Sequence, residues 1–361
     1  MTQRTDKVSW STTLAFGAPA IGAGYMYLIL SLYVMKFSTD VLLIAPAVMG
    51  AIFSLSRIWD AISDPLAGYL SDRTTFRLGR RRTWILCSCI PISIGFYAVF
   101  APPFSMQGSE LTLWMTIAIV GFYSAMTLFF VPHMALGAEL SIDYHERSRL
   151  FGVRHIFYTL GSILSLGAMY LLINEEFAEG GNVRLLARDL AFVAIGVMVV
   201  LVLYAVVYLR ERPEFQNRQQ GGPLQAFRDI WGNPHARLLI TVTFIENVGS
   251  AAIAALTLYI SQYVVGAPAM APLIILAYMV PSSLFVPVWI PLSKRFGKIK
   301  VWMGGYDSYW LVVRRDVFSA LHREPGSAFV FDHVSRSVCR LGCGLRRDAG
   351  AVPTRRCYRL R

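Results

Sequence analysis

The sequence predicts an all-α membrane protein, a helix bundle with about eight membrane-spanning segments. Hydrophobic residues make up 55% of its 361 residues and charged residues only 16%, a balance that a soluble globular domain does not have. The apolar residues occur in long runs, and about 20 such residues are needed to cross the ~30 Å hydrocarbon core of a bilayer. The basic residues fall mainly in alternate connections between these runs, as in a multi-pass membrane protein.

The predicted spans are runs of about 18 or more residues with few charges. Clear polar breaks occur at residues 72–82 and 210–237. The runs cover residues 14–35, 41–70, 83–100, 111–140, 151–173, 190–209, 238–265 and 270–292.

The distribution of Lys and Arg predicts the orientation of the chain. Up to Gly305, 18 of them lie at the N-terminus or in the connections after the second, fourth, sixth and eighth runs, against three in the other connections. Cytoplasmic connections carry the excess of basic residues, so the N-terminus is predicted to be cytoplasmic. The net charge of +12 therefore indicates a membrane topology, and no nucleic-acid partner is predicted.

The second run contains three charged residues, Arg57, Asp60 and Asp64. Their spacing of i, i+3 and i+7 places them on one face of a helix. Each charge inside a membrane costs about 2.5–3.5 kcal/mol on insertion scales, so such residues face a wet cavity or a partner. Two carboxylates this close need a cation or a proton between them, which predicts a site for Na⁺ or H⁺. The alternative is that Arg57 neutralises Asp60 for structural reasons alone.

Three motifs carry a resemblance to a known family: RIWDAISDP with GYLSDRTTFRLGRRR (57–65 and 68–82), ALGAELSIDYHERSRLFGVRHIF (135–157) and YLRERPEF (208–215). Together they resemble the glycoside–pentoside–hexuronide:cation symporters of the major facilitator superfamily. The resemblance covers residues 10 to about 303. It implies about twelve spans, two helix bundles and cation-coupled solute transport by alternating access.

The resemblance implies a cation site at Asp60, Ser63, Asp64 and Thr127, with Asp60 and Asp64 as the ligands of Na⁺ if sodium is the coupling ion. It also implies that Arg154 contacts the solute. Where the melibiose-transporting members carry carboxylates and a stacking Trp, this chain has Ala18, Phe130 and Met134, and Phe130 and Met134 are predicted to contact the solute. A galactoside is therefore not expected, and a less hydroxylated, acidic or amphipathic solute fits better.

Further residues are assigned to the solute path or to a gate. Tyr27 can hydrogen-bond a solute or belong to a packing surface, and Glu246 with Asn247 is predicted to face the cavity from the seventh run. His133 and His155 are interpreted as packing histidines. For Glu139 the resemblance implies a salt bridge at the cytoplasmic gate. The predicted gate and structural residues are Arg57, Asp72, Arg73, Arg82, Glu139 and Arg147.

The predicted domains follow from the runs and the long polar connection. Residues 1–209 form a six-helix bundle, 210–237 a cytoplasmic linker and 238–303 an incomplete second bundle. The tail 304–361 has no long apolar run, and from Tyr306 it contains 11 Arg and no Lys. This composition predicts an out-of-frame, disordered segment, and the alternative is a basic cytoplasmic domain.

The predicted function is cation-coupled symport of a sugar-like or other small organic solute across the inner membrane of a bacterium. The alternative is a truncated or frameshifted, transport-inactive member of the same family. No H-E-x-x-H, G-x-S-x-G or phosphate-binding motif is present, so an enzyme is not predicted, nor is a cofactor. The expected partners are the solute and the lipid bilayer, and the expected state is a monomer. The sequence leaves the solute and the choice between Na⁺ and H⁺ open.

Overall fold

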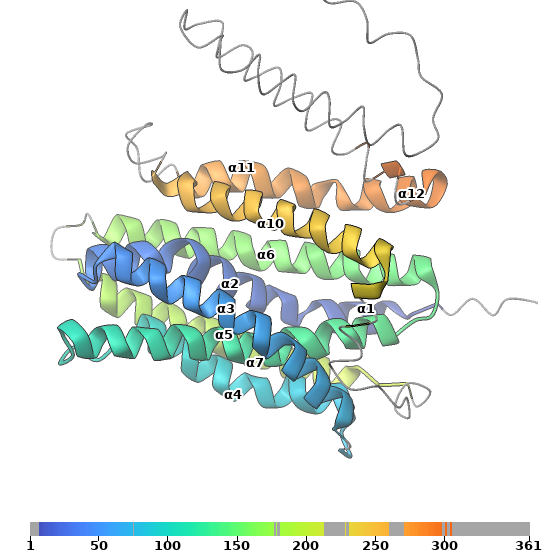
Figure 1. Ribbon diagram of the computed structural model, residues 1–361, viewed down its shortest axis with the longest axis horizontal. Coiled ribbons are helices and arrows are strands. Elements are labelled where there is room, and N and C mark those ends of the chain that lie inside the picture. Colours follow the sequence, from blue (N-terminus) through green and yellow to red (C-terminus); the bar gives the residue numbers. More distant parts are fainter. Residues whose placement is uncertain are drawn as a thin grey trace, which may run out of the picture. The chain divides into compact units, whose positions relative to one another are not determined.

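The computed structural model describes residues 7–74, 76–176, 178, 181–212, 228, 231–259, 271–297, 300, 301 and 304, and it divides the chain into two compact units, residues 1–290 and 291–361. Over the described residues the secondary structure is helical, which confirms the predicted all-α class. In chain order the helices in Figure 1 are α1 (Trp10–Gly17), α2 (Pro19–Lys36), the π-helical turn η1 (Phe37–Val41), α3 (Pro46–Arg73), α4 (Arg80–Phe100), α5 (Gly108–Glu139), α6 (Tyr144–Glu176), α7 (Val183–Tyr208), α10 (Pro234–Tyr259), α11 (Ala271–Leu284) and α12 (Val286–Phe296).

Five stretches of the described chain are long and apolar enough to cross a membrane, and they are Trp10–Val41, Arg80–Phe100, Gly108–Glu139, Tyr144–Glu176 and Val183–Tyr208. The predicted second span, α3, has 28 residues and so the length to cross, but it is not among these five, and Arg57, Asp60 and Asp64 interrupt its apolar residues.

Two predicted spans are interrupted at prolines. The first consists of α1 and α2, which meet at Ala18, because Pro19 has no N–H to continue the hydrogen-bond ladder. The predicted run 270–292 consists of α11 and α12, and the break at Phe285 lies just before Pro287. The predicted bundle boundary at 210–237 and the predicted tail fall largely outside the described residues, and both stay predictions.

The most extensive helix contacts pair α2 with α6, α4 with α5, α3 with α5 and α4 with α7. These helices run side by side in Figure 1. Large aromatic side chains, among them Phe16, Tyr33, Phe96, Phe122 and Phe129, are fully buried between them. The outward surfaces of α4 and α7 remain apolar, and Ile94 and Val193 are each 65% exposed. A bilayer solvates such surfaces, whereas water would not.

Close approach of α2 and α6 depends on glycines. A Cβ atom built on Gly161 would lie 1.8 Å from the carbonyl oxygen of Ile21, and one on Gly24 would lie 2.2 Å from the carbonyl oxygen of Tyr158. The obstacle is backbone in both cases, so no side chain can move aside to make room. Gly24 and Gly161 therefore permit the close packing of α2 and α6.

Gly161→Ala is expected to destabilise the bundle by about 1–3 kcal/mol, the usual range for overpacking, because α2 and α6 must separate. The measurement is the midpoint of thermal unfolding of the purified protein in detergent. Gly167→Ala is the matched control on the same helix, since a Cβ at Gly167 would meet nothing within 4 Å. Equal midpoints for the two variants would contradict the packing argument.

Candidate cation and solute site

A pocket of about 140 Å³ opens between α3 and α5 and is also bordered by α2. It brings together carboxylates, aromatic rings and a hydroxyl that are far apart in the sequence. Its lining residues are Tyr27, Arg57, Asp60, Asp64, Tyr123, Met126, Thr127, Phe130 and Val131. Three of the four residues predicted for the cation site and two of those predicted for the solute therefore line one pocket.

Asp60 is held by the guanidinium of Arg57. Arg57 Nη1 donates to Asp60 Oδ2 over 3.2 Å and to the hydroxyl of Tyr27, also over 3.2 Å. The guanidinium carbon lies 4.2 Å from the centroid of the Tyr123 ring, a cation–π distance. The second carboxylate oxygen of Asp60, Oδ1, is buried without a hydrogen-bond partner among the described residues. Asp60 thus keeps an oxygen that can accept a ligand.

Asp64 has a different partner, the hydroxyl of Thr127 on α5, which donates to Asp64 Oδ1 over 2.8 Å. In the described part of the chain no Lys or Arg forms an ion pair with Asp64. Arg57 offsets one of the two negative charges, so the pair keeps a net charge of about −1 when both carboxylates are ionised. The bound cation or proton that the sequence predicts would neutralise this charge.

Ser63 does not join the pocket. Its hydroxyl is 3.5 Å from the carbonyl oxygen of Asp60, within its own helix. One residue along a helix is a rotation of about 100°, so Ser63 is directed away from Asp64. The structure therefore brings together Asp60, Asp64 and Thr127 but not this fourth predicted ligand.

Arg154 lies on α6 next to the pocket and is 8% exposed. Its guanidinium carbon is 5.8 Å from the centroid of the Phe130 ring, which itself lines the pocket. Among the described residues Arg154 has no carboxylate partner, and its polar contact is His133, whose Nδ1 is 3.5 Å from Arg154 Nε. A buried guanidinium held only by neutral groups is suited to bind an anion.

His133 orients this arginine. It is fully buried, and its ring stacks on Phe16 and Phe129 with centroid distances of 4.6 and 5.0 Å. Its Nε2 is 2.9 Å from the carbonyl oxygen of Phe16, so Nε2 carries the proton and Nδ1 accepts from Arg154. His133 is thus a packing histidine, as predicted, and it also contacts Arg154, which no local sequence pattern indicated.

Three residues predicted for the solute do not reach this pocket. Met134 is 38% exposed and is not part of the lining. Glu246 and Asn247 are exposed on α10, where the amide nitrogen of Asn247 donates to the carbonyl of Thr243 over 2.7 Å. Met134 directly follows the buried His133, and one step along a helix rotates its side chain by about 100°, away from the buried face.

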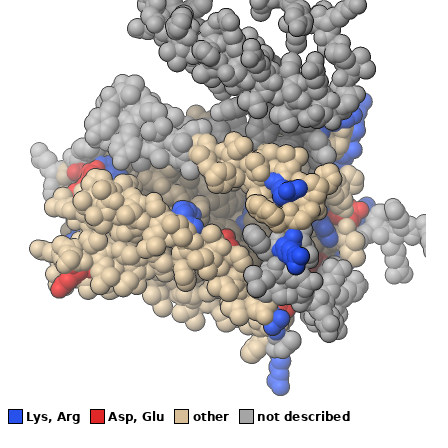
Figure 2. Space-filling model, in the orientation of Figure 1, with Lys and Arg blue, Asp and Glu red and all other residues tan. Residues whose placement is uncertain are grey.

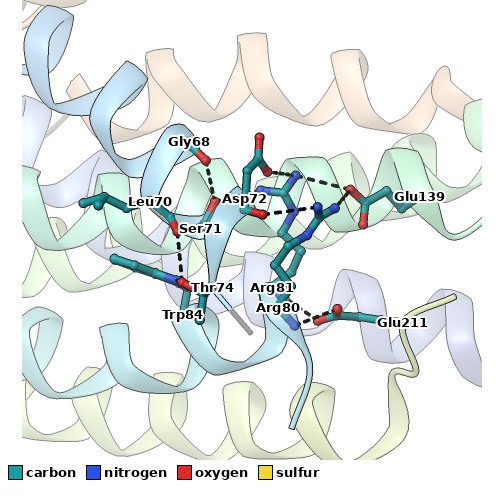
Figure 3. A network of polar contacts seen from close by, with 10 residues as sticks. All are labelled: Gly68, Leu70, Ser71, Asp72, Thr74, Arg80, Arg81, Trp84, Glu139 and Glu211. Carbon is teal, nitrogen blue, oxygen red and sulfur yellow. Dashed lines mark hydrogen bonds and ion pairs between the residues drawn. The ribbon is translucent and has the colours of Figure 1, made fainter. Parts of the chain in front are cut away.

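Near the N-terminal end of α4 an ion-pair network joins α3, α4 and α5 (Figure 3). Glu139 accepts from Arg80 Nη2 over 2.7 Å and from Arg81 Nη2 over 3.2 Å. Arg81 also pairs with Asp72 and donates to the hydroxyl of Ser71 over 2.7 Å. Asp72 and Glu139 were both predicted gate residues. Their partners Arg80 and Arg81 were not singled out, although the run of three arginines at 80–82 is the signal that could have identified them.

The same end of α4 is capped by Glu211, which lies beyond the end of α7 (Figure 3). Its carboxylate accepts the backbone N–H groups of Arg80, Arg81 and Arg82 over 2.7–2.8 Å. These are among the N–H groups that a helix start leaves without a partner, and a negative charge there is favourable. Sequence reasoning missed this cap, because it spans 130 residues.

The remaining predicted gate residues lie outside this network. Arg82 donates to the carbonyl of Val206 and fixes α4 to α7. Arg73 lies 4.1 Å above the ring of Tyr69, and Arg147 donates to the carbonyl of Ser141 over 2.6 Å. Arg57 lines the pocket that contains Asp60 and Asp64. In the view of Figure 2 most of the described surface is uncharged, and Lys and Arg side chains gather mainly toward the end where α3 ends.

Comparison with known proteins gives the class of this protein. Residues 15–313 match the family described as MFS/sugar transport protein. The chain therefore belongs to this family of major facilitator transporters, which are not enzymes, and the resemblance to cation-coupled sugar symporters is confirmed.

Three curated relatives are similar to the chain. An uncharacterized symporter from Synechocystis sp. is 38% identical over 49% of the chain. An isoprimeverose transporter from Lactiplantibacillus pentosus is 25% identical over 81%, and a putative 2,3-dihydroxypropane-1-sulfonate exporter from Escherichia coli is 27% identical over 83%. The matched regions span 35%, 61% and 66% of these relatives' own lengths.

Proposed function

We propose that this protein is a multi-pass transporter of a bacterial inner membrane that couples the uptake of a small organic solute to the entry of Na⁺ or H⁺. The observation that carries the proposal is the pocket in which Asp60, Asp64 and Thr127 lie beside Tyr27 and Phe130, next to the buried Arg154. In this proposal the carboxylates hold the cation and Arg154 contacts the solute. The N-terminus is cytoplasmic, and the working unit is a monomer.

The charges of the pocket support coupling between the two ligands. Without a cation the two carboxylates repel each other and only one of them has a basic partner. A bound cation removes the repulsion and lets the helices that carry the pocket pack in a second arrangement. One cation moving down 100 mV supplies about 2.3 kcal/mol, enough for a roughly 50-fold concentration ratio of the solute.

The surroundings of Arg154 favour a solute with an acidic group, such as a sugar acid or a sulfonate. Buried charges are stable when they are paired, and among the described residues this guanidinium contacts the neutral His133 and the Phe130 ring but forms no ion pair. An anion bound by the η nitrogens would supply the missing charge while His133 holds the Nε end. One relative is named as a putative exporter of a sulfonate, which agrees with this choice.

The test is uptake by the purified chain in proteoliposomes under an inward Na⁺ or H⁺ gradient. We expect labelled glucuronate to enter, glucose to enter more slowly and methyl-galactoside not to compete. Arg154→Gln is expected to raise the KM for glucuronate at least about tenfold, the value of a lost charge-assisted contact. Arg77→Gln, the same change at an exposed position, is the control.

Two results would count against parts of the proposal. Competition by methyl-galactoside, or an unchanged KM in Arg154→Gln, would contradict the acidic solute and leave the cation site standing. If none of the solutes enters under either gradient, the chain is the transport-inactive alternative.

A further inference from the structure

A second cavity, of about 510 Å³, lies between α4, α5 and α7. It is at the opposite end of α4 from the ion-pair network, beside the connection 101–107 that joins α4 to α5. Its wall is mostly apolar and aromatic, with two arginines. Its lining residues include Ile94, Tyr97, Ala98, Phe104, Trp114 and Arg184.

Arg184 is fixed in position by the chain around it. Its Nη2 donates to the carbonyl oxygens of Pro102 and Pro103 over 2.9 and 3.3 Å, and its guanidinium carbon is 4.2 Å from the centroid of the Phe104 ring. Its Nε is buried and has no hydrogen-bond partner among the described residues. These contacts orient the guanidinium without neutralising it.

The other basic residues at this end of the bundle are neutralised. Lys36 pairs with Asp40 at 2.6 Å and with Glu176 at 2.9 Å, and Arg188 pairs with its neighbour Asp189 at 2.8 Å. In the described part of the chain, Arg184 forms no ion pair with any carboxylate. It also lies in the first turn of α7, where the helix dipole adds to its positive field.

The walls of the cavity continue onto surfaces suited to hydrocarbon. Ile94 is 65% exposed and Phe104 is 60% exposed. The ring of Tyr97 packs against Phe192 of α7 at an interplanar angle of 51°, with the ring centroids 4.8 Å apart, and the indole N–H of Trp114 donates to the carbonyl of Ala98 over 2.9 Å. Aromatic side chains of this kind gather where a membrane meets water. The packing of α10 on α2 and of α11 on α6 leaves α4 and α7 to face the bilayer.

We propose that this cavity binds an anionic phospholipid, with the phosphate at Arg184 and one acyl chain along Ile94, Tyr97 and Trp114. The charge of Arg184 selects the anionic headgroup, and the apolar wall explains why the occupant is a lipid and not a free phosphate ion. With the N-terminus in the cytoplasm the bound lipid belongs to the outer leaflet. The site is separate from the transport pocket and does not depend on transport activity.

The test is a titration of the purified, delipidated chain in detergent with phosphatidylglycerol or phosphatidylcholine, with bound lipid counted by native mass spectrometry. Phosphatidylglycerol is expected to bind more tightly. Arg184→Ala should weaken its binding about fivefold, the contribution of one basic residue at a membrane surface, and leave phosphatidylcholine unchanged. Arg77→Ala, which removes the same charge at the other end of the bundle, should change neither affinity by more than about twofold.

A second variant keeps the proposal testable if Arg184→Ala does not fold. Ala98→Phe fills the cavity without changing charge and should weaken both lipids. Equal loss of phosphatidylglycerol binding in the Arg184 and Arg77 variants would overturn the proposal, because it would mean a general effect of net charge. Displacement of phosphatidylglycerol by millimolar inorganic phosphate would overturn it as well, as would unchanged binding in Ala98→Phe.

Discussion

Asp64→Asn is expected to abolish cation-driven accumulation of the solute and to leave the protein folded. Asparagine keeps the shape of the side chain and can still accept the hydrogen bond from Thr127, but it removes the negative charge that Arg57 does not offset. Asp60 and Arg57 then form a neutral pair, and nothing in the pocket requires a cation. A concentration ratio of up to roughly 50-fold under a 100 mV gradient should fall to about one.

The measurement compares uptake against a gradient with exchange of solute between equal concentrations. Exchange is expected to survive in Asp64→Asn, because it needs no coupling ion. Ser63→Ala is the matched control, since Ser63 is adjacent in sequence and its hydroxyl bonds within its own helix. Accumulation in Asp64→Asn equal to that of the wild type would show that the carboxylate pair is not the coupling site.

Glu139→Gln is expected to lower the free energy of unfolding by about 3 kcal/mol. Glu139 is the carboxylate shared by Arg80 and Arg81, whose side chains are only 6% and 5% exposed. Removing its charge leaves Arg81 paired with Asp72 and leaves Arg80 without a side-chain carboxylate partner among the described residues, since Arg80 contacts Asp72 only at its backbone carbonyl. The value is at the low end for breaking a buried pair, because Glu139 itself keeps 16% exposure.

The free energy of unfolding is measured in detergent at several denaturant concentrations and extrapolated linearly to zero denaturant. Glu110→Gln on the same helix is the control, because Glu110 is exposed in the first turn of α5. The effect should be smaller than about 1 kcal/mol there, where only the helix dipole is involved. A loss in Glu139→Gln no larger than in this control would mean that the network in Figure 3 contributes little to stability.

The sequence by itself determined the helical class, the ends of the N-terminal spans to within seven residues and the family. These follow from local rules: apolar runs long enough to cross a bilayer, and charges that are too costly to bury without a purpose. The spacing of Arg57, Asp60 and Asp64 also determined the face of α3 that lines the pocket. A helical period is a property of neighbouring residues, so no knowledge of other helices was needed.

Only the tertiary structure decided which residues from different helices meet. It set His133 against Arg154 and left Ser63 and Met134 outside the pocket, whereas the family resemblance had already put Thr127 in one site with Asp64. It also paired Glu139 with Arg80 and Arg81 and put Glu211 at the start of α4, a contact across 130 residues. The physical reason is that such contacts depend on how helices are rotated and offset against one another. Glycines such as Gly161 fix this relative rotation and offset, because they contact the backbone of a neighbouring helix. The residue pattern of one helix does not specify how that helix is placed against another.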